Sequence, residues 1–238
     1  MGSTGKIRGG DVVRSNRPTE GVSDVDSRTT PMSDEDKQIV GGKDNWSTRY
    51  FQTATAFDIN KALRSMVDKG YTIDEALSRL GKSDNTIEGI KKTIDAMDRN
   101  MYPTNKDMEV IRLAKADYAE RILKDLDVSS TVINEVNNMW LKGGISEGGL
   151  KQIRDNAIGA KITESGFMST TYNKSLNDSA FKDRRIRIDM KVAKGTNGMF
   201  SPTGQESEFV LARGTSYKID DVTFDNKDHR LVFHVSVG

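Results

Sequence analysis

Two glutamates stand two residues apart near the C-terminus, in the stretch GQESEFVLARGTSYKI at residues 204–219. Side chains of a strand alternate between its faces, so Glu206 and Glu208 would lie side by side on one face. Adjacent carboxylates repel each other, and a lone pair of glutamates at a strand edge is usually only a solvated surface. The pair becomes a candidate for chemistry when other functional residues accompany it.

Two further segments carry residue types that suit catalysis or anion binding. The segment GFMSTT, residues 166–171, places the hydroxyls of Ser169, Thr170 and Thr171 behind an apolar pair. Arg112 stands in the middle of the strand-like segment MEVIRLA. A guanidinium is planar, always charged and able to bind anionic oxygens bidentately. Arg121 and Arg154 are poorer candidates for this arginine, because both lie in helical patterns.

Other common motifs are missing or fail in their context. The chain has no cysteine, which excludes disulfides, thiolate catalysis and cysteine zinc sites. It has two histidines, His229 and His234, and we interpret His234 as an ordinary strand residue. The GKS tripeptide at residues 81–83 ends a helical pattern and lacks the first glycine of a phosphate loop. No G-x-G-x-x-G follows a strand, so a Rossmann site is unsupported.

The hydrophobic period predicts the elements that must position these residues. Residues 58–71 place Ile59, Leu63, Met66 and Val67 at helical spacing, and helices are also expected at 72–81, 85–97, 115–126 and 130–144. Thr72 and Glu75 form a capping box. Strict alternation predicts a half-buried strand at 184–192, and strands are expected at 107–114, 207–212, 215–222 and 230–237. Helices first and strands later indicate an α+β fold.

Length and composition narrow the function classes. A chain of 238 residues fits one domain or two small ones. The net charge of +1 gives no basic field that would draw nucleic acid or an anionic membrane. No apolar run is long enough for a membrane span, and the N-terminus lacks the hydrophobic core of a Sec signal. Residues 1–45 have almost no large apolar residues and are predicted to be a disordered arm, either a solvated tail or a delivery or docking segment.

Taken together, these segments resemble the ADP-ribosyltransferase exoenzymes, the arginine–serine–glutamate group that includes bacterial mono-ADP-ribosylating toxins and phage transferases. The family carries an arginine on an early strand, an F-x-S-T-[ST] strand, and a [QE]-x-E turn that leads into E-x-L-L-P-R-x-x-x-Y-x-I. Here Arg213, Tyr217 and Ile219 follow Glu208 at the family offsets. INKALR, residues 59–64, is similar to the family's upstream I-N-x-x-L-R helix. Arg112 departs from the pattern, since Ile111 and Leu113 replace the usual aromatic and glycine neighbours.

The resemblance implies a fold and a cofactor. It covers residues 46–238 and implies a helical cluster, 46–105, packed on a mixed β-sheet core, 106–238, with an NAD cleft between them. It assigns Glu208 to the charge that develops on the ribose, because carboxylates stabilise oxocarbenium-like transition states. Ser169 orients that carboxylate. The resemblance implies that the remaining residues to contact NAD are Arg112, Arg64, Asn60, Thr170 and Thr171, and it requires no metal.

Glu206 is expected to select the acceptor. In the family, a glutamate two residues before the catalytic one accompanies arginine modification, and a glutamine there accompanies other acceptors. Gln205 would take that position if the motif slipped by one residue. We therefore expect a protein target with an acceptor arginine. Phe200 of the preceding loop either helps to recognise this target or only packs within the loop.

Two other activities fit the same residues. Water as acceptor would make the chain an NAD glycohydrolase, and a catalytically silent member would act as a binding or virion-associated protein. We expect a monomer that acts in the cytoplasm of the producing cell or of a host cell, delivered as an effector or with a virion.

Overall fold

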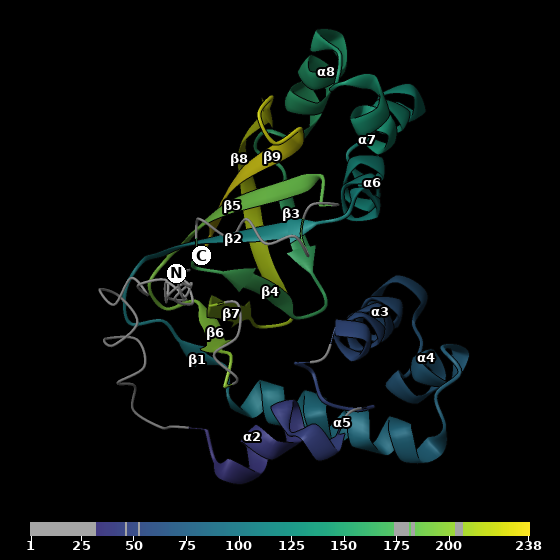
Figure 1. The fold of residues 1–238 in the computed structure, drawn as a ribbon, viewed down its shortest axis with the longest axis vertical. Coiled ribbons are helices and arrows are strands. Elements are labelled where there is room, and N and C mark those ends of the chain that lie inside the picture. The colour runs from purple at the N-terminus through teal and green to yellow at the C-terminus, as the bar shows by residue number, and fades with distance from the viewer. Residues whose placement is uncertain (1–31, 46, 52, 174–180, 182–183, 203–206) are drawn as a thin grey trace, which may run out of the picture. The chain divides into compact units, whose positions relative to one another are not determined.

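A computed structural model describes residues 32–45, 47–51, 53–173, 181, 184–202 and 207–238. Residues 32–238 form one compact unit, in which two groups of helices pack against a sheet (Figure 1). The predicted α+β class is confirmed, and the sheet is mixed, because β5 (Ile186–Val192) pairs parallel with β9 (Arg230–Val237) while its other ladders are antiparallel. Residues 1–31 of the predicted arm lie outside the part of the chain that the structure describes.

The first helical group comes from the N-terminal part of the unit. It contains α2 (Asp34–Gly41), α3 (Thr53–Lys69), α4 (Ile73–Arg79) and α5 (Asp84–Arg99). Helix α4 begins at the predicted capping box, in which the Thr72 hydroxyl accepts a hydrogen bond from the Glu75 amide and the Glu75 carboxylate accepts one from the Thr72 amide. Ile59 of α3 and Ile90 of α5 are fully buried, as their helical spacing predicts.

Among the described residues, nine strands form one hydrogen-bonded sheet in the order β1-β6-β7-β4-β2-β5-β9-β8-β3. The remaining strands are β1 (Tyr102–Pro103), β2 (Met108–Ala114), β3 (Lys161–Glu164), β4 (Met168–Thr171), β6 (Asn197–Phe200), β7 (Glu208–Leu211) and β8 (Thr215–Asp225). Strand β5 shows the predicted alternation, since its four apolar side chains are all buried. The three short strands β1, β3 and β6 were not expected from the sequence.

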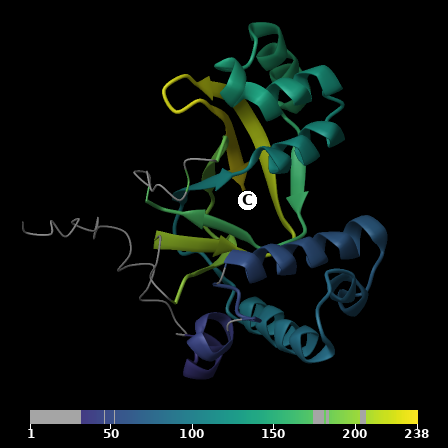
Figure 2. The ribbon, with the colours of Figure 1, turned by 45° about the vertical axis from the view of Figure 1, so that its right-hand side comes forward.

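The second helical group lies between β2 and β3 in the chain. Figure 2 shows α6 (Ala116–Asp125), α7 (Ser130–Lys142) and α8 (Glu147–Ala157) clustered at the end of the sheet remote from α2–α5. Each helical group builds a hydrophobic core with part of the sheet. Met168 and Phe209 belong to the core of the second group, whereas Phe167 and Val210 belong to the core of the first. The boundary between the cores therefore runs along β4 and β7, the strands that carry the predicted catalytic residues.

Two features of the helical part differ from the sequence expectation. Helix α2 lies inside the stretch 1–45, because Ser33 caps it, Val40 is completely buried and Asp36 accepts hydrogen bonds from Arg99 and Asn100 of the α5 terminus. Val67, which the helical spacing predicts on the apolar stripe of α3, is 69% exposed. Residues 67–70 are all exposed, so the buried face of α3 ends before its last turn.

Candidate active site

The arginine, serine and glutamate predicted from three distant segments meet on adjacent strands. The Ser169 hydroxyl on β4 donates a hydrogen bond to Oε1 of Glu208 on β7. Arg112 on β2 donates from Nη1 to the backbone carbonyl of Ser169 at 2.9 Å. The three residues are far apart in the sequence, so the order β7-β4-β2 of the sheet is what brings them together.

The register of β4 against β7 explains why the serine reaches the glutamate. Thr171 lies opposite Glu208 and Thr170 opposite Phe209, so Ser169 is the diagonal neighbour of Glu208 on the same face. The Thr170 side chain points to the other face and donates to the Phe209 carbonyl at 2.6 Å. The bond adds to the backbone ladder between β4 and β7 that sets this register, and a slip of one residue would move the serine away from the carboxylate.

The backbone just before Glu208 is also held in place. Ser207 has a left-handed φ of 49°, an uncommon conformation for a residue other than glycine, and its carbonyl accepts a hydrogen bond from the Tyr172 amide at 3.1 Å. The Ser201 amide donates to the Glu208 carbonyl at 3.0 Å. The predicted acceptor-selecting residue Glu206, like Gln205, lies outside the described residues.

Arg112 sits in an aromatic and polar cradle. Its guanidinium lies 5.1 Å from the ring centroid of Tyr118 on α6, and the Tyr118 hydroxyl contacts the hydroxyl of Tyr217 at 3.3 Å. Burial is the main cause that raises the pKa of Tyr217, so the phenol is neutral and can hold Tyr118 by a hydrogen bond. The buried Nε of Arg112 has no hydrogen-bond partner among the described residues. A buried donor in this state suits an anionic ligand.

Helix α3 anchors the turn that leads into β4. The Asn60 side chain accepts a hydrogen bond from the Phe167 amide at 2.8 Å and contacts the Tyr50 hydroxyl at 3.3 Å. The backbone of Gly166 lies so close to the Asn60 side chain that a Cβ at this position would be 2.7 Å from Oδ1 of Asn60. Asn60 therefore positions the backbone two residues before Ser169, in addition to the cofactor-binding role predicted for it.

Glu164 joins two arginines, a role that the sequence does not predict. This carboxylate is fully buried and accepts from Arg64 of α3 at 2.9 Å, from Arg121 of α6 at 3.0 Å and from the Gly166 amide at 3.0 Å. Arg64, for which a contact to the cofactor stays a prediction, and Arg121, which lies in a helical pattern, both donate to this carboxylate. The stretch KITE is the only local signal, and it does not reveal partners 100 and 43 residues away.

The ion pairs of Glu164 predict how acid affects stability. Burial alone would raise the pKa of this carboxyl, but Arg64, the Gly166 amide and Arg121 outweigh burial and hold the pKa below its ordinary value of 4.5. A depressed pKa means that the pairs stabilise the fold above that value and that this contribution is lost as the pH falls through the folded pKa.

Replacing Glu164 with glutamine is expected to lower the free energy of unfolding at pH 7 by about 2–3 kcal/mol, less than for a fully buried pair because both arginines stay partly hydrated. Urea denaturation of both proteins between pH 7 and pH 3 measures this. The difference between them should shrink as the pH falls below about 4.5. A difference that does not change with pH would contradict the assigned ion pairs.

The structure also places Phe200 and Arg154, two further residues for which the sequence suggests a role. Phe200 is half-buried, and its ring centroid lies 5.8 Å from that of Tyr172 and 4.9 Å from that of Phe209. The structure places Phe200 at the end of strand β6, opposite Phe209, and not in a loop as the sequence predicts. Packing on the sheet thus accounts for part of its surface, and recognition of a protein target stays a prediction. Arg154 lies on α8 and pairs with Asp221 at 3.1 Å, apart from the three strands that carry the candidate site.

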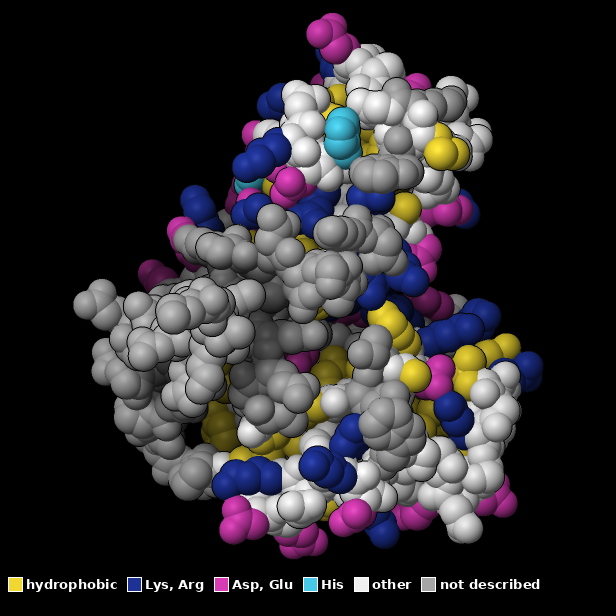
Figure 3. Space-filling model, viewed as in Figure 1, with side chains coloured by type: hydrophobic (Ala, Val, Ile, Leu, Met, Phe, Trp, Pro, Cys, Tyr) yellow, Lys and Arg dark blue, Asp and Glu magenta, His cyan; other side chains and the backbone are white. Residues whose placement is uncertain are grey.

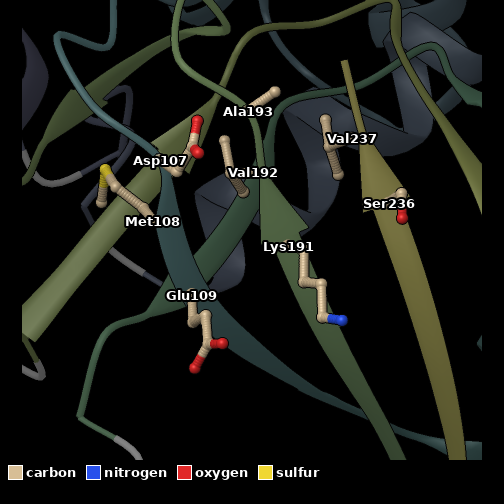
Figure 4. Close-up of a pocket in the computed structure, with 8 residues that line it drawn as sticks. All are labelled: Asp107, Met108, Glu109, Lys191, Val192, Ala193, Ser236 and Val237. Carbon is tan, nitrogen blue, oxygen red and sulfur yellow. The ribbon is translucent and has the colours of Figure 1, made fainter.

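A cavity of about 510 Å³ lies at the ends of β2, β5 and β9, away from the residues predicted to act (Figure 4). Its lining is Asp107, Met108, Glu109, Lys191, Val192, Ala193, Ser236 and Val237. The Asp107 carboxylate there already accepts a hydrogen bond from the Lys194 amide at 2.8 Å. Within the part of the chain that the structure describes, no group of His, Cys, Asp and Glu side chains suits a metal, and no helix is long and apolar enough to cross a membrane.

Comparison with known protein families shows which family has this combination of residues. The family model of the ADP-ribosyltransferase exoenzymes matches residues 42–237. The chain belongs to this family. The match includes α3, β2, β4 and β7, the elements that carry the arginine, serine and glutamate. An NAD-dependent ADP-ribosyltransferase activity is supported at this level, and the predicted family resemblance is confirmed.

Solved structures show the same fold at low sequence identity. C3stau2 from S. aureus, solved with NAD, is 19% identical with a TM-score of 0.60, and the match covers 87% of each chain. The C3 exoenzyme of Clostridium limosum is 20% identical with a TM-score of 0.57, over 87% of this chain and 86% of that one. The toxin Plx2a from Paenibacillus larvae is 21% identical with a TM-score of 0.57, over 87% of each. Among curated protein sequences, none matches this exoenzyme significantly.

The cradle of Arg112 gives a test of its role in the exoenzyme. Replacing Arg112 with lysine should raise the KM for NAD by about tenfold, because lysine keeps the charge but loses the planar fork and the stacking on Tyr118. Steady-state nicotinamide release measures this. Arg187→Lys on β5, whose partner is Asp189 at 2.6 Å, is the matched control and should leave the KM unchanged. Equal KM values for NAD in both variants would show that Arg112 does not contribute to NAD binding.

Proposed function

We propose that this exoenzyme transfers ADP-ribose from NAD to an arginine side chain of a protein target. The observation that carries the proposal is the hydrogen bond from Ser169 to Glu208, with Arg112 bound to the same serine. It supplies an oriented carboxylate beside a fixed guanidinium, which the cleavage of a charged nucleotide requires.

In the proposed reaction the bond between the ribose C1′ and the nicotinamide nitrogen breaks first. Nicotinamide leaves with the bonding electron pair, and positive charge develops on the ribose, where the Glu208 carboxylate stabilises it. A guanidinium nitrogen of the acceptor then bonds to C1′ and releases a proton. The products are nicotinamide, ADP-ribosylated arginine and that proton.

The acceptor follows from Glu206. A free guanidinium has a pKa above about 12, so it approaches the site protonated and is then a poor nucleophile. A second carboxylate two residues before Glu208 would dock this cation and take up its proton. The same cation would reduce the repulsion between the two glutamates. Water in place of the guanidinium would give NAD glycohydrolase activity from the same Glu208.

Labelled NAD tests the proposal directly. The exoenzyme is incubated with cell lysate and NAD that is labelled in the adenosine part, and both protein-bound label and free nicotinamide are measured. Label on protein together with nicotinamide release is the expected result. Nicotinamide without protein label would support hydrolysis instead, and neither product would support a catalytically silent binding protein.

A further inference from the structure

The charges around the buried Glu164 do not balance. One carboxylate faces two guanidiniums, those of Arg64 and Arg121, which gives the cluster a net charge of +1. The carboxylate is completely buried, but the arginine side chains are 22% and 33% exposed. Figure 3 shows basic side chains on the surface between α6 and α3, the two helices that carry these arginines. The positive charge of the cluster therefore faces solvent.

Each arginine keeps donors for another anion. Arg64 contacts Glu164 through Nε and Nη2, and Arg121 contacts it through Nη2. Among the described residues, no hydrogen bond engages Nη1 of either guanidinium. A carboxylate that occupies one edge of an arginine fixes its plane, so the opposite edge is presented without further loss of side-chain entropy.

We propose that Glu164 is a positioning residue that holds Arg64 and Arg121 together as a paired binding site for the diphosphate of NAD. This inference rests on the proposed function, because the ligand is the nucleotide of that reaction. A diphosphate carries one negative charge on each phosphate, and two planar guanidiniums from opposite helices can each bind one phosphate. The inference adds Arg121 and Glu164 to the site.

The position of Glu164 in the chain connects this pair to the reacting centre. Glu164 ends β3, and the turn that follows is tied to α3 twice, by Arg64 to Glu164 and by Asn60 to Phe167. Ser169 comes two residues after Phe167 and orients Glu208. A diphosphate held by Arg64 would thus lie against the same helix that sets the position of the serine. Arg121 brings α6 to the same point from the other helical group.

Three variants separate positioning from a merely structural role. Arg121→Gln removes one guanidinium, Glu164→Gln keeps both arginines but removes the charge that aligns them, and Arg154→Gln breaks the exposed pair with Asp221 as the control. For each we measure kcat and KM for NAD by nicotinamide release, the Kd for ADP by calorimetry and the melting temperature. ADP is the probe because it carries the diphosphate without the nicotinamide.

Arg121→Gln is expected to raise the KM for NAD and the Kd for ADP together by about tenfold, with kcat changed less than about threefold, since a lost charge-assisted contact to the diphosphate weakens binding and not chemistry. Glu164→Gln should do the same and also melt at a lower temperature. Arg154→Gln should match the wild-type KM and Kd.

The inference is overturned if Arg121→Gln has the KM and the ADP affinity of Arg154→Gln, even if it melts earlier, because that outcome means a purely structural ion pair. If Glu164→Gln does not fold, Arg121→Gln decides alone. A wild-type protein that neither binds nor consumes NAD rejects the proposed function and this inference with it. A wild type that consumes NAD, with an unaffected Arg121→Gln, rejects only the inference.

Discussion

Replacing Glu208 with glutamine is expected to lower the rate of nicotinamide release from NAD by about 10²–10³-fold, with or without an acceptor. Glutamine keeps the size of the side chain and can still accept the hydrogen bond from Ser169. It lacks the negative charge that opposes the charge on the ribose at the transition state. The loss should therefore appear in kcat, while the KM for NAD changes little.

The control for this variant is Glu88→Gln on α5, an exposed glutamate whose nearest cation is Lys91 at 3.8 Å. It should retain the wild-type kcat and melting temperature. Ser169→Ala should fall between the two, because the carboxylate stays but loses the group that orients it. A Glu208→Gln variant that keeps more than about a tenth of the wild-type kcat would remove Glu208 from the chemical step.

Replacing Glu206 with glutamine is expected to abolish transfer to a guanidinium while NAD hydrolysis continues. General-base assistance and docking of the cation are worth about 10²–10⁴-fold, and both depend on the charge of this carboxylate. Agmatine, a small guanidinium compound, serves as acceptor, and ADP-ribosyl-agmatine and free ADP-ribose are quantified in the same reaction. The ratio of transfer to hydrolysis should fall at least about a hundredfold.

The neighbouring residue supplies the control for this experiment. Gln205→Ala should leave the ratio of transfer to hydrolysis unchanged if Glu206 selects the acceptor. A lost transfer in Gln205→Ala with full transfer in Glu206→Gln would mean that the motif is shifted by one residue. Equal ratios in all three proteins would show that neither side chain selects an arginine acceptor.

The sequence predicts those features that depend on residues close together in the chain. The residue types of MEVIRLA and SEFVLA predict strands, the family resemblance adds a strand at FMSTT, and the structure forms β2, β7 and β4 there. The capping box at Thr72 begins a helix through contacts that span three residues. The meeting of Arg112, Ser169 and Glu208 is not local, and the sequence predicts it only through the resemblance to the family motif.

The missed parts depend on contacts between distant segments. Glu164 gains its significance from Arg64 and Arg121, which belong to two different helical groups, and no spacing rule connects them. The strands β1, β3 and β6 have two to four residues and, unlike the equally short β4 and β7, carry no motif that marks them. Helix α2 has one buried side chain and depends on bonds from Asp36 to the end of α5. Propensity alone does not reveal such elements.

Mass spectrometry of the modified target is the most direct test of the central claim, which is transfer of ADP-ribose from NAD to arginine. A lysate treated with the exoenzyme and NAD is digested, and the peptides that carry ADP-ribose are sequenced to the modified residue. We predict ADP-ribose on arginine side chains, with no such peptides from the Glu208→Gln protein. ADP-ribose on asparagine or another residue type, equally abundant with Glu206→Gln, would contradict the claim.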